Sequence, residues 1–110
     1  MKNGVRQYCG MVGKDTTVEI ASKGAKLCTI NALISLENYL GDSKKIKQIV
    51  KVTGYVNTSS SFEEHSEVMN ASSKLLHNVF GEKGNHARTA IGVSSLPYSM
   101  PVEVEMIVEV

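Results

Sequence analysis

Residues 86–110 read HARTAIGVSSLPYSMPVEVEMIVEV, and this stretch decides the fold. Two strand-like runs, at about 87–94 and 102–110, lie on either side of a turn at Leu96–Pro97. In the second run valine and methionine alternate with glutamate, the period of two that predicts a strand with one apolar face. Arg88 lies near the start of the first run. A single arginine at the mouth of an apolar strand pair suits a small anion, because a guanidinium can hold a carboxylate with two parallel hydrogen bonds.

A long amphipathic helix is predicted upstream of this stretch. Apolar residues recur there at steps of three and four, which is the spacing of one helical face. The cap is predicted at 15–17, with Glu19 three residues after Thr16 as in a capping box, and Gly41 is a natural stop. The predicted buried stripe consists of Val18, Ala21, Ala25, Cys28, Ala32, Leu36 and Tyr39.

A strand and a second helix are predicted between that helix and the C-terminal stretch. β-Branched residues at about 47–57 predict the strand, with Val50, Val52 and Val56 on the same face as Gly54. A glycine inside a strand indicates a bulge or a close approach by another backbone. The second helix is expected from about Phe62 to Phe80, with Ser61 and Glu64 as its capping box and Gly81 as its stop. A further short strand is possible at 4–12.

This order of elements predicts an α+β fold in a single domain spanning residues 1–110. A chain of 110 residues fits one domain. Helices alternating with strands predict an open sheet with two helices on one face. The other face needs a cover, and we expect a second copy of the chain there because the sequence holds no third helix pattern.

Composition argues against several classes of function. The chain has 12 basic and 11 acidic residues, so it offers no concentrated positive charge for a nucleic acid. It has no apolar run near the ~20 residues that a membrane span requires. No apolar segment of a signal peptide follows Lys2, which predicts a cytoplasmic location.

The cysteines and histidines give no metal-binding pattern. Cys9 and Cys28 lack a CxxC arrangement, and we expect both to be buried, although a reactive Cys9 is the alternative. His65, His77 and His86 are not spaced for a shared metal ion. These residues therefore predict no metal site.

Several segments together resemble the RidA family, also called YjgF-type proteins and long labelled L-PSP endoribonucleases. The resemblance covers roughly residues 10–110 and is closest to the longer bacterial branch, which has a His-Ala-Arg-(Ser/Thr)-Ala-(Val/Ile)-Gly motif. The matching segments are 49–57, 68–72, 79–82, Gly84, 86–88, 90–93, 96–97 and 102–105.

The resemblance implies a specific assembly and chemistry. RidA-like proteins are homotrimers with a chorismate-mutase-like fold and a ligand cleft at each subunit interface. Active members hydrolyse reactive 2-imino acids, or their enamine tautomers, to 2-keto acids and ammonia without a metal or cofactor. The arginine that grips the carboxylate of such a metabolite corresponds to Arg88, and the glutamate near the attacking water corresponds to Glu103. Asn70 matches the asparagine of the second helix. Ala90 stands where well-known members often have a cysteine, a position that can contribute through its backbone carbonyl.

One part of the family pattern has no counterpart in this sequence. The family usually opens with a strand hairpin whose Ser-Gly pair helps to line the cleft. The residues before Asp15 correspond only to the tail of that region, which leaves open whether the cleft is complete.

Each site residue also has a structural interpretation. Taken alone, Arg88 could serve in an ion pair, Glu103 could be a solvent-facing strand residue, and Asn70 could be a surface or helix-packing residue. Counting residues through the turn places Arg88 and Glu103 roughly 20 Å apart in one subunit, which predicts a cleft between subunits. Three functions stay open: an imine deaminase, a trimeric binding protein for a carboxylate metabolite without turnover, and an endoribonuclease. The last ranks lowest because the charge is balanced and the sequence shows no histidine pair for phosphodiester cleavage.

Overall fold

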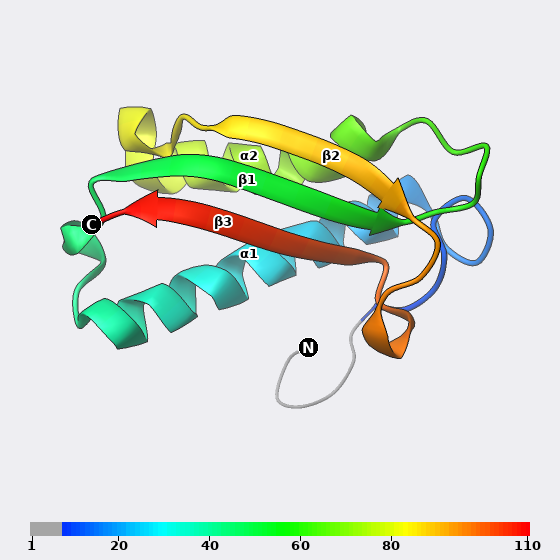
Figure 1. Ribbon diagram of the computed structural model, residues 1–110, viewed down its shortest axis with the longest axis horizontal. Coiled ribbons are helices and arrows are strands. Elements are labelled where there is room, and N and C mark those ends of the chain that lie inside the picture. The colour runs from blue at the N-terminus through cyan, green and yellow to red at the C-terminus, as the bar shows by residue number, and fades with distance from the viewer. Residues whose placement is uncertain (1–7) are drawn as a thin grey trace.

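The computed structural model describes residues 8–110. Its main elements follow in the predicted order: α1 (Val18–Leu40), β1 (Gln48–Asn57), α2 (His65–Phe80), β2 (Ala87–Val93) and β3 (Val102–Glu109) (Figure 1). Short 3-10 helices precede the strands at η1 (Ser43–Lys45), η2 (Gly81–Gly84) and η3 (Pro97–Ser99). The possible strand at 4–12 lies partly outside the described residues, and within them Val12 forms only isolated bridges, to Thr16 and Thr58.

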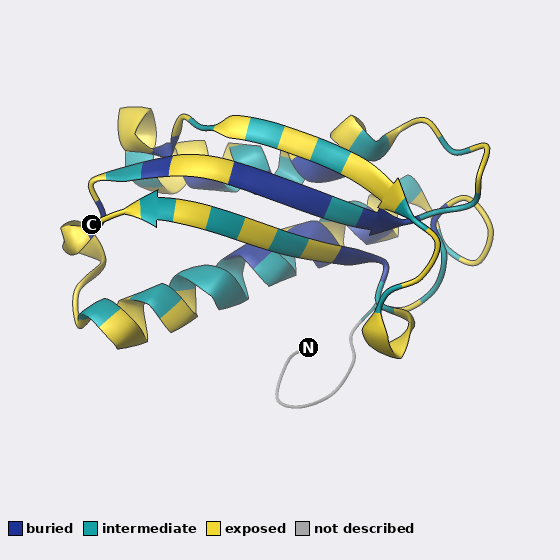
Figure 2. Ribbon diagram, in the orientation of Figure 1, coloured by how far each residue is buried: buried dark blue, intermediate teal, exposed yellow. Residues whose placement is uncertain are grey.

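The three strands form one mixed sheet in the order β2-β1-β3. β1 is parallel to β2 and antiparallel to β3. Both helices pack on one face of this sheet, as predicted (Figure 1). The expectation that the last two strands pair with each other is wrong, because β1, the most buried strand, lies between them (Figure 2).

The core lies between the helices and the helix-facing side chains of β1. Val52 and Val56 are buried there, with Gly54 between them. The prediction that Val50 shares this face is wrong, since 45% of its surface is exposed and Ile49 is buried instead. The register with β3 shifts between Ile49 and Lys51, and such a bulge turns the side chains before it to the opposite face.

Gly54 marks a close approach, although not by another backbone. A Cβ atom at this position would collide with the buried side chain of Met69 from α2. The missing side chain therefore lets α2 pack close to the centre of the sheet.

The helix boundaries differ from the predicted ones by a few residues. Thr17, not Thr16, caps α1, since its hydroxyl accepts from the Ile20 N–H at 3.2 Å. Gly41 ends α1 in the left-handed conformation, with φ 83°, as predicted. The capping box at Ser61 is wrong: residues 59–62 form a turn, and α2 begins only at His65 without a side-chain cap.

The buried stripe of α1 is confined to its first half (Figure 2). Ala21 and Ala25 are fully buried, but Tyr39 is 87% exposed, so its predicted burial is wrong. Thr29 is also buried and lies 2.7 Å from the Ser72 hydroxyl of α2. Small side chains at this contact bring the two helices together over the sheet.

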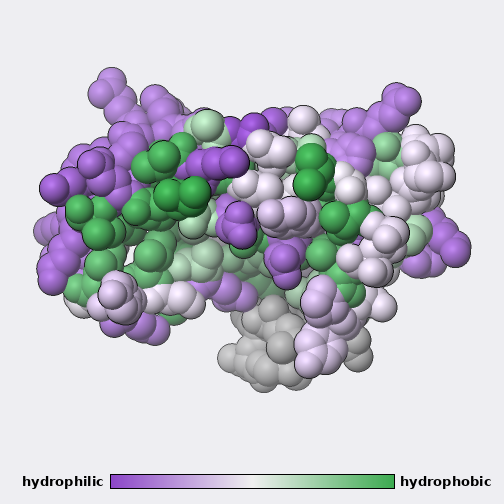
Figure 3. Space-filling model, viewed as in Figure 1, coloured by the Kyte–Doolittle hydropathy of each residue, from purple (hydrophilic) through white to green (hydrophobic). Residues whose placement is uncertain are grey.

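The sheet face turned away from the helices is open in a single copy of the chain. Exposed Ile91 and Ile107 lie there beside charged residues such as Lys51 and Glu105. Figure 3 shows apolar and charged side chains intermixed on this side of the molecule. Among the described residues, no helix has the length and apolar character needed to cross a bilayer.

Candidate functional site

Two side chains of α2 hold the guanidinium of Arg88 by hydrogen bonds to one of its nitrogens. The residue pairs in register with buried Val52, which places its side chain on the helix-facing side of edge strand β2. Its Nη1 donates to Asn70 Oδ1 at 2.8 Å and to Ser73 Oγ at 3.3 Å. Among the described residues, no hydrogen bond or ion pair occupies Nη2 or Nε. These two N–H groups point along one edge of the guanidinium, the edge that can bind a carboxylate with two hydrogen bonds.

A second layer of hydrogen bonds holds this arrangement. His86 Nδ1 lies 2.6 Å from the carbonyl oxygen of Gly84, which only accepts, so Nδ1 carries the hydrogen. The Nε2 of His86 therefore accepts from the Ser73 hydroxyl, 2.9 Å away. The Ser73 oxygen in turn accepts from Arg88. The three hydrogen bonds thus form a chain in which Arg88 donates to Ser73, Ser73 donates to His86, and His86 donates to the Gly84 carbonyl.

A shallow pocket of about 560 Å³ surrounds these groups. Its polar lining carries cations and histidines but no carboxylate: Ser73, Lys74, His77, Asn85, His86 and Arg88. The sequence shows no histidine pair for phosphodiester cleavage, yet His77 and His86 both line this pocket. Ser73, Lys74 and His77 were missed, although their spacing from Asn70 on a predicted helix would place all four on one face.

Of the other predicted site residues, Ala90 lies near Arg88 and Glu103 lies away from it. Ala90 follows Arg88 on the same face of β2, opposite Gly54. Glu103 lies on β3, the opposite edge, paired with Tyr55 and exposed on the open face. The register separates Arg88 and Glu103 by three residues along the sheet and two strand spacings across it, which is about 14 Å between Cα atoms and shorter than the predicted 20 Å. One copy of the chain does not bring them together.

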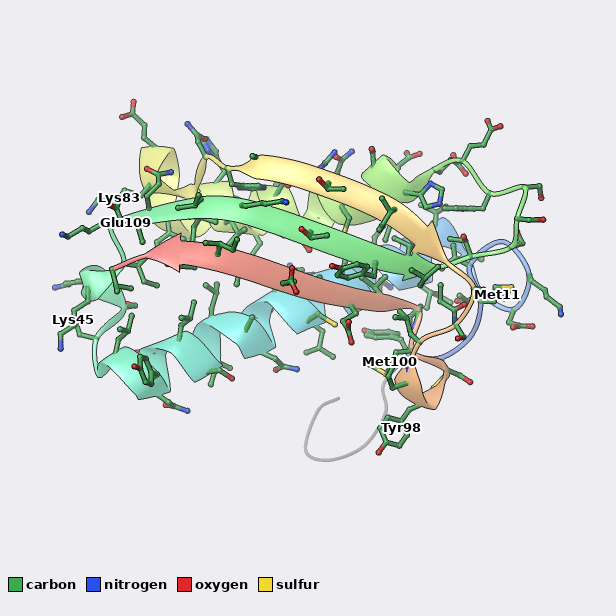
Figure 4. The ribbon with its side chains drawn as sticks, viewed as in Figure 1. Met11, Lys45, Lys83, Tyr98, Met100 and Glu109 are labelled. Carbon is green, nitrogen blue, oxygen red and sulfur yellow. The ribbon has the colours of Figure 1, made fainter. Side chains whose placement is uncertain are left out.

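Glu103 instead borders a second cleft, of about 320 Å³, between α1 and the loop before β3. Figure 4 marks the two ends of the sheet: Lys83 lies at the end where β2 begins, and Tyr98 and Met100 lie at the end where β3 begins. Cys28 of α1 lines this second cleft and donates weakly to the Val102 carbonyl at 3.6 Å. Burial raises the pKa of the Cys28 thiol, and the Glu103 carboxylate acts in the same direction. The thiol is therefore a poor nucleophile at neutral pH.

The prediction that Cys9 is buried is wrong. Its side chain is exposed rather than buried, because the chain before Val12 runs over the surface beside η3, where the Gly10 N–H donates to the Ser99 carbonyl. Within residues 8–110, no group of three or more histidine, cysteine or acidic side chains is arranged to hold a metal ion.

Comparison with known proteins gives consistent matches. The family model described as "YjgF/chorismate_mutase-like, putative endoribonuclease" matches residues 1–110. Protein TCP17 of Trypanosoma cruzi is 41% identical over 101 residues, which is 91% of this chain but 63% of that protein. The chain thus spans less than two thirds of the length of this relative.

Two solved structures share the fold. The protein Atu1372 of unknown function from Agrobacterium tumefaciens superposes with a TM-score of 0.97 at 40% identity, over 100% of this chain and 71% of that one. A putative endoribonuclease from Shewanella oneidensis MR-1 gives 0.93 at 31% identity, over 98% of this chain and 72% of that one.

Proposed function

Since the chain belongs to the YjgF/chorismate-mutase-like family, we propose that it hydrolyses reactive 2-imino acids, or their enamine tautomers, to 2-keto acids and ammonia. We further propose that the clefts lie between copies of a homotrimer, as the family resemblance implies. The cytoplasmic location stays a prediction from the sequence.

One observation carries the proposal: hydrogen bonds to the described residues fix the guanidinium of Arg88 but engage only one of its three nitrogens. Asn70 and Ser73 occupy Nη1, and the Nη2–Nε edge has no partner among the described residues. An arginine side chain is charged, and its planar fork matches a carboxylate. A substrate carboxylate bound there would hold the adjacent imine carbon at a defined place over the edge of β2.

The reaction needs little more than positioning and a route for protons. Water adds to the imine carbon and forms the new C–O bond; the C–N bond then breaks, and the nitrogen leaves as ammonia with both hydrogens of the water. The imine is already electrophilic, so fixing it next to a water supplies much of the acceleration. Glu103 of a neighbouring copy is the proposed group that orients this water and moves its proton.

The alternative is a trimeric protein that binds a carboxylate metabolite without turnover. It is supported by the distance between Arg88 and Glu103 in one copy, since binding needs only the arginine whereas hydrolysis needs both residues in one cleft. An endoribonuclease is less well supported. Both ring nitrogens of His86 are engaged, with Gly84 and Ser73, so the two histidines of the pocket do not offer a free acid and base pair.

A coupled assay with freshly generated 2-iminobutyrate tests the proposal. We expect ammonia release faster than the spontaneous reaction, and a loss of about 10- to 100-fold in kcat/KM for Arg88→Ala, because hydrogen bonds to a charged group contribute roughly 1.5–3 kcal/mol. Lys23→Ala, which removes an exposed cation from α1 away from the pocket, is the matched control. Full activity of Arg88→Ala would refute the anchoring role, and binding of 2-oxobutyrate without any turnover would favour the alternative.

The proposed assembly has its own test. Light scattering should give a mass of about 36 kDa, three times the chain mass of 11.9 kDa. A mass of one chain at the concentration of the assay would contradict a cleft between copies.

A further inference from the structure

The site at Arg88 continues along one face of α2. Asn70, Ser73, Lys74 and His77 are spaced at i, i+3, i+4 and i+7, so they form a continuous stripe beside the edge of β2. The first two residues orient the guanidinium, as described above. The next two, Lys74 and His77, line the same pocket but make no hydrogen bond to Arg88 among the described residues.

The charge of this pocket exceeds what a single carboxylate needs. Arg88 and Lys74 bring two permanent positive charges, and no carboxylate borders the pocket. In the part of the chain that the structure describes, neither cation forms a salt bridge. Lys74 is exposed and carries its ammonium on a flexible stem, one helical turn from Asn70, where Cβ atoms lie about 5–6 Å apart.

His77 lines the pocket and makes a hydrogen bond through one of its two ring nitrogens. Its Nδ1 lies 3.2 Å from Asn85 Oδ1, an acceptor, so the hydrogen sits on Nδ1 and Nε2 has no partner among the described residues. The polar lining thus extends beyond Lys74 to the end of α2. The pocket is shallow and open, so its walls do not limit the length of a ligand that runs from Arg88 along α2.

We infer that this pocket selects substrates with a second anionic group: Arg88 binds the carboxylate next to the imine, and Lys74 binds a distal carboxylate or phosphate. This inference rests on the proposed function, since it assigns the substrate class of the same site. The two distal groups share the chemistry that an ammonium recognises, a localised negative charge with oxygen acceptors.

Calorimetric titration of the full chain with two stable products tests the inference. 2-Oxoglutarate carries the distal carboxylate and 2-oxobutyrate lacks it. We expect 2-oxoglutarate to bind about three- to five-fold more tightly, the range of an exposed ion pair of up to 1 kcal/mol, and added salt to weaken this preference. Lys74→Met should abolish the preference and leave the affinity for 2-oxobutyrate unchanged. Lys23→Met, at an exposed position of α1 away from the pocket, should change the affinity for neither ligand. Inorganic phosphate should compete with 2-oxoglutarate more strongly in the wild-type protein than in Lys74→Met, where only Arg88 can bind it.

The outcomes separate this inference from the proposed function. If Arg88→Ala loses both ligands while Lys74→Met keeps the wild-type preference, only the inference is overturned. If Arg88→Ala keeps both ligands, the proposed function fails and the inference fails with it. If a short RNA binds through Lys74 and neither keto acid binds, the pocket serves a nucleic acid and both are overturned.

Discussion

At the scale of the residue, Asn70 controls how much of Arg88 is available to a ligand. Its side-chain oxygen takes one guanidinium nitrogen without neutralising the charge. An aspartate at this position would form an ion pair with Arg88 and compete with the substrate carboxylate.

We therefore predict that Asn70→Asp raises KM by about 10- to 100-fold, more than Asn70→Ala does, because a charge-assisted pair contributes roughly 1.5–3 kcal/mol. Its thermal stability should equal or exceed that of the wild-type protein. Steady-state kinetics and a melting curve check both statements. A lower melting temperature with unchanged KM would indicate a purely structural asparagine.

Cys28 gives a prediction on pH. Burial raises the pKa of its thiol above 9.0, so the folded state holds this proton more tightly than the unfolded chain does. The resulting stabilisation is complete below the unfolded-state pKa and is lost as the pH rises through the folded-state pKa.

Above about pH 8.5, the ordinary pKa of a cysteine thiol, the free energy of unfolding should therefore fall more steeply for the wild-type protein than for Cys28→Ala. Urea denaturation at several pH values measures the free energy of unfolding. Cys9→Ala, at an exposed cysteine, is the control. If the free energy of unfolding depends on pH in the same way for all three proteins, the Cys28 thiol has the same pKa in the folded and unfolded states, which would contradict the prediction.

Individual site residues were only partly predictable from the sequence. Arg88 was found because a cation stands alone in an apolar stretch. The spacing of Lys74 and His77 from Asn70 was visible too, but nothing in the sequence says which face of α2 meets β2. The exposure of Cys9 depends on how the first described residues cross the surface beside η3, which no periodicity encodes.

At the scale of the element, periodicity predicted each helix and strand, whereas local hydrogen bonds decided the ends. Two adjacent threonines offered nearly equivalent caps for α1, and the capping-box spacing favoured the wrong one. The hydroxyl of Thr17 makes the bond to Ile20 N. The bulge at the start of β1 was not predictable, since it arises from pairing with β3, a partner more than 40 positions away in the printed sequence.

The N-cap of α1 can be tested with two variants, one at Thr17 and one at Thr16. Thr17→Ala should lower the free energy of unfolding by about 1 kcal/mol, because an N–H of the first turn of α1 loses its acceptor. Thr16→Ala should cost clearly less. Chemical denaturation of both variants measures the difference, and the reverse order would place the cap at Thr16.

At the scale of the whole molecule, strand order decides what one chain can do. The sequence predicted two helices on one face of a sheet, but it did not reveal that β1 separates the last two strands. This order puts Arg88 and Glu103 on opposite edges and opposite faces, each bordering a different cleft. In the proposed mechanism, a single copy therefore binds the anion at Arg88, while hydrolysis requires a second copy to bring a glutamate to it.

A crystal structure of the protein in complex with 2-oxobutyrate tests this account most directly. We predict the ligand carboxylate within hydrogen-bonding distance of Nη2 and Nε of Arg88, with Asn70 still on Nη1 and Glu103 of a neighbouring copy facing the keto carbon. A ligand bound instead in the cleft beside Cys28, or at Arg88 with no second copy near it, would contradict the account.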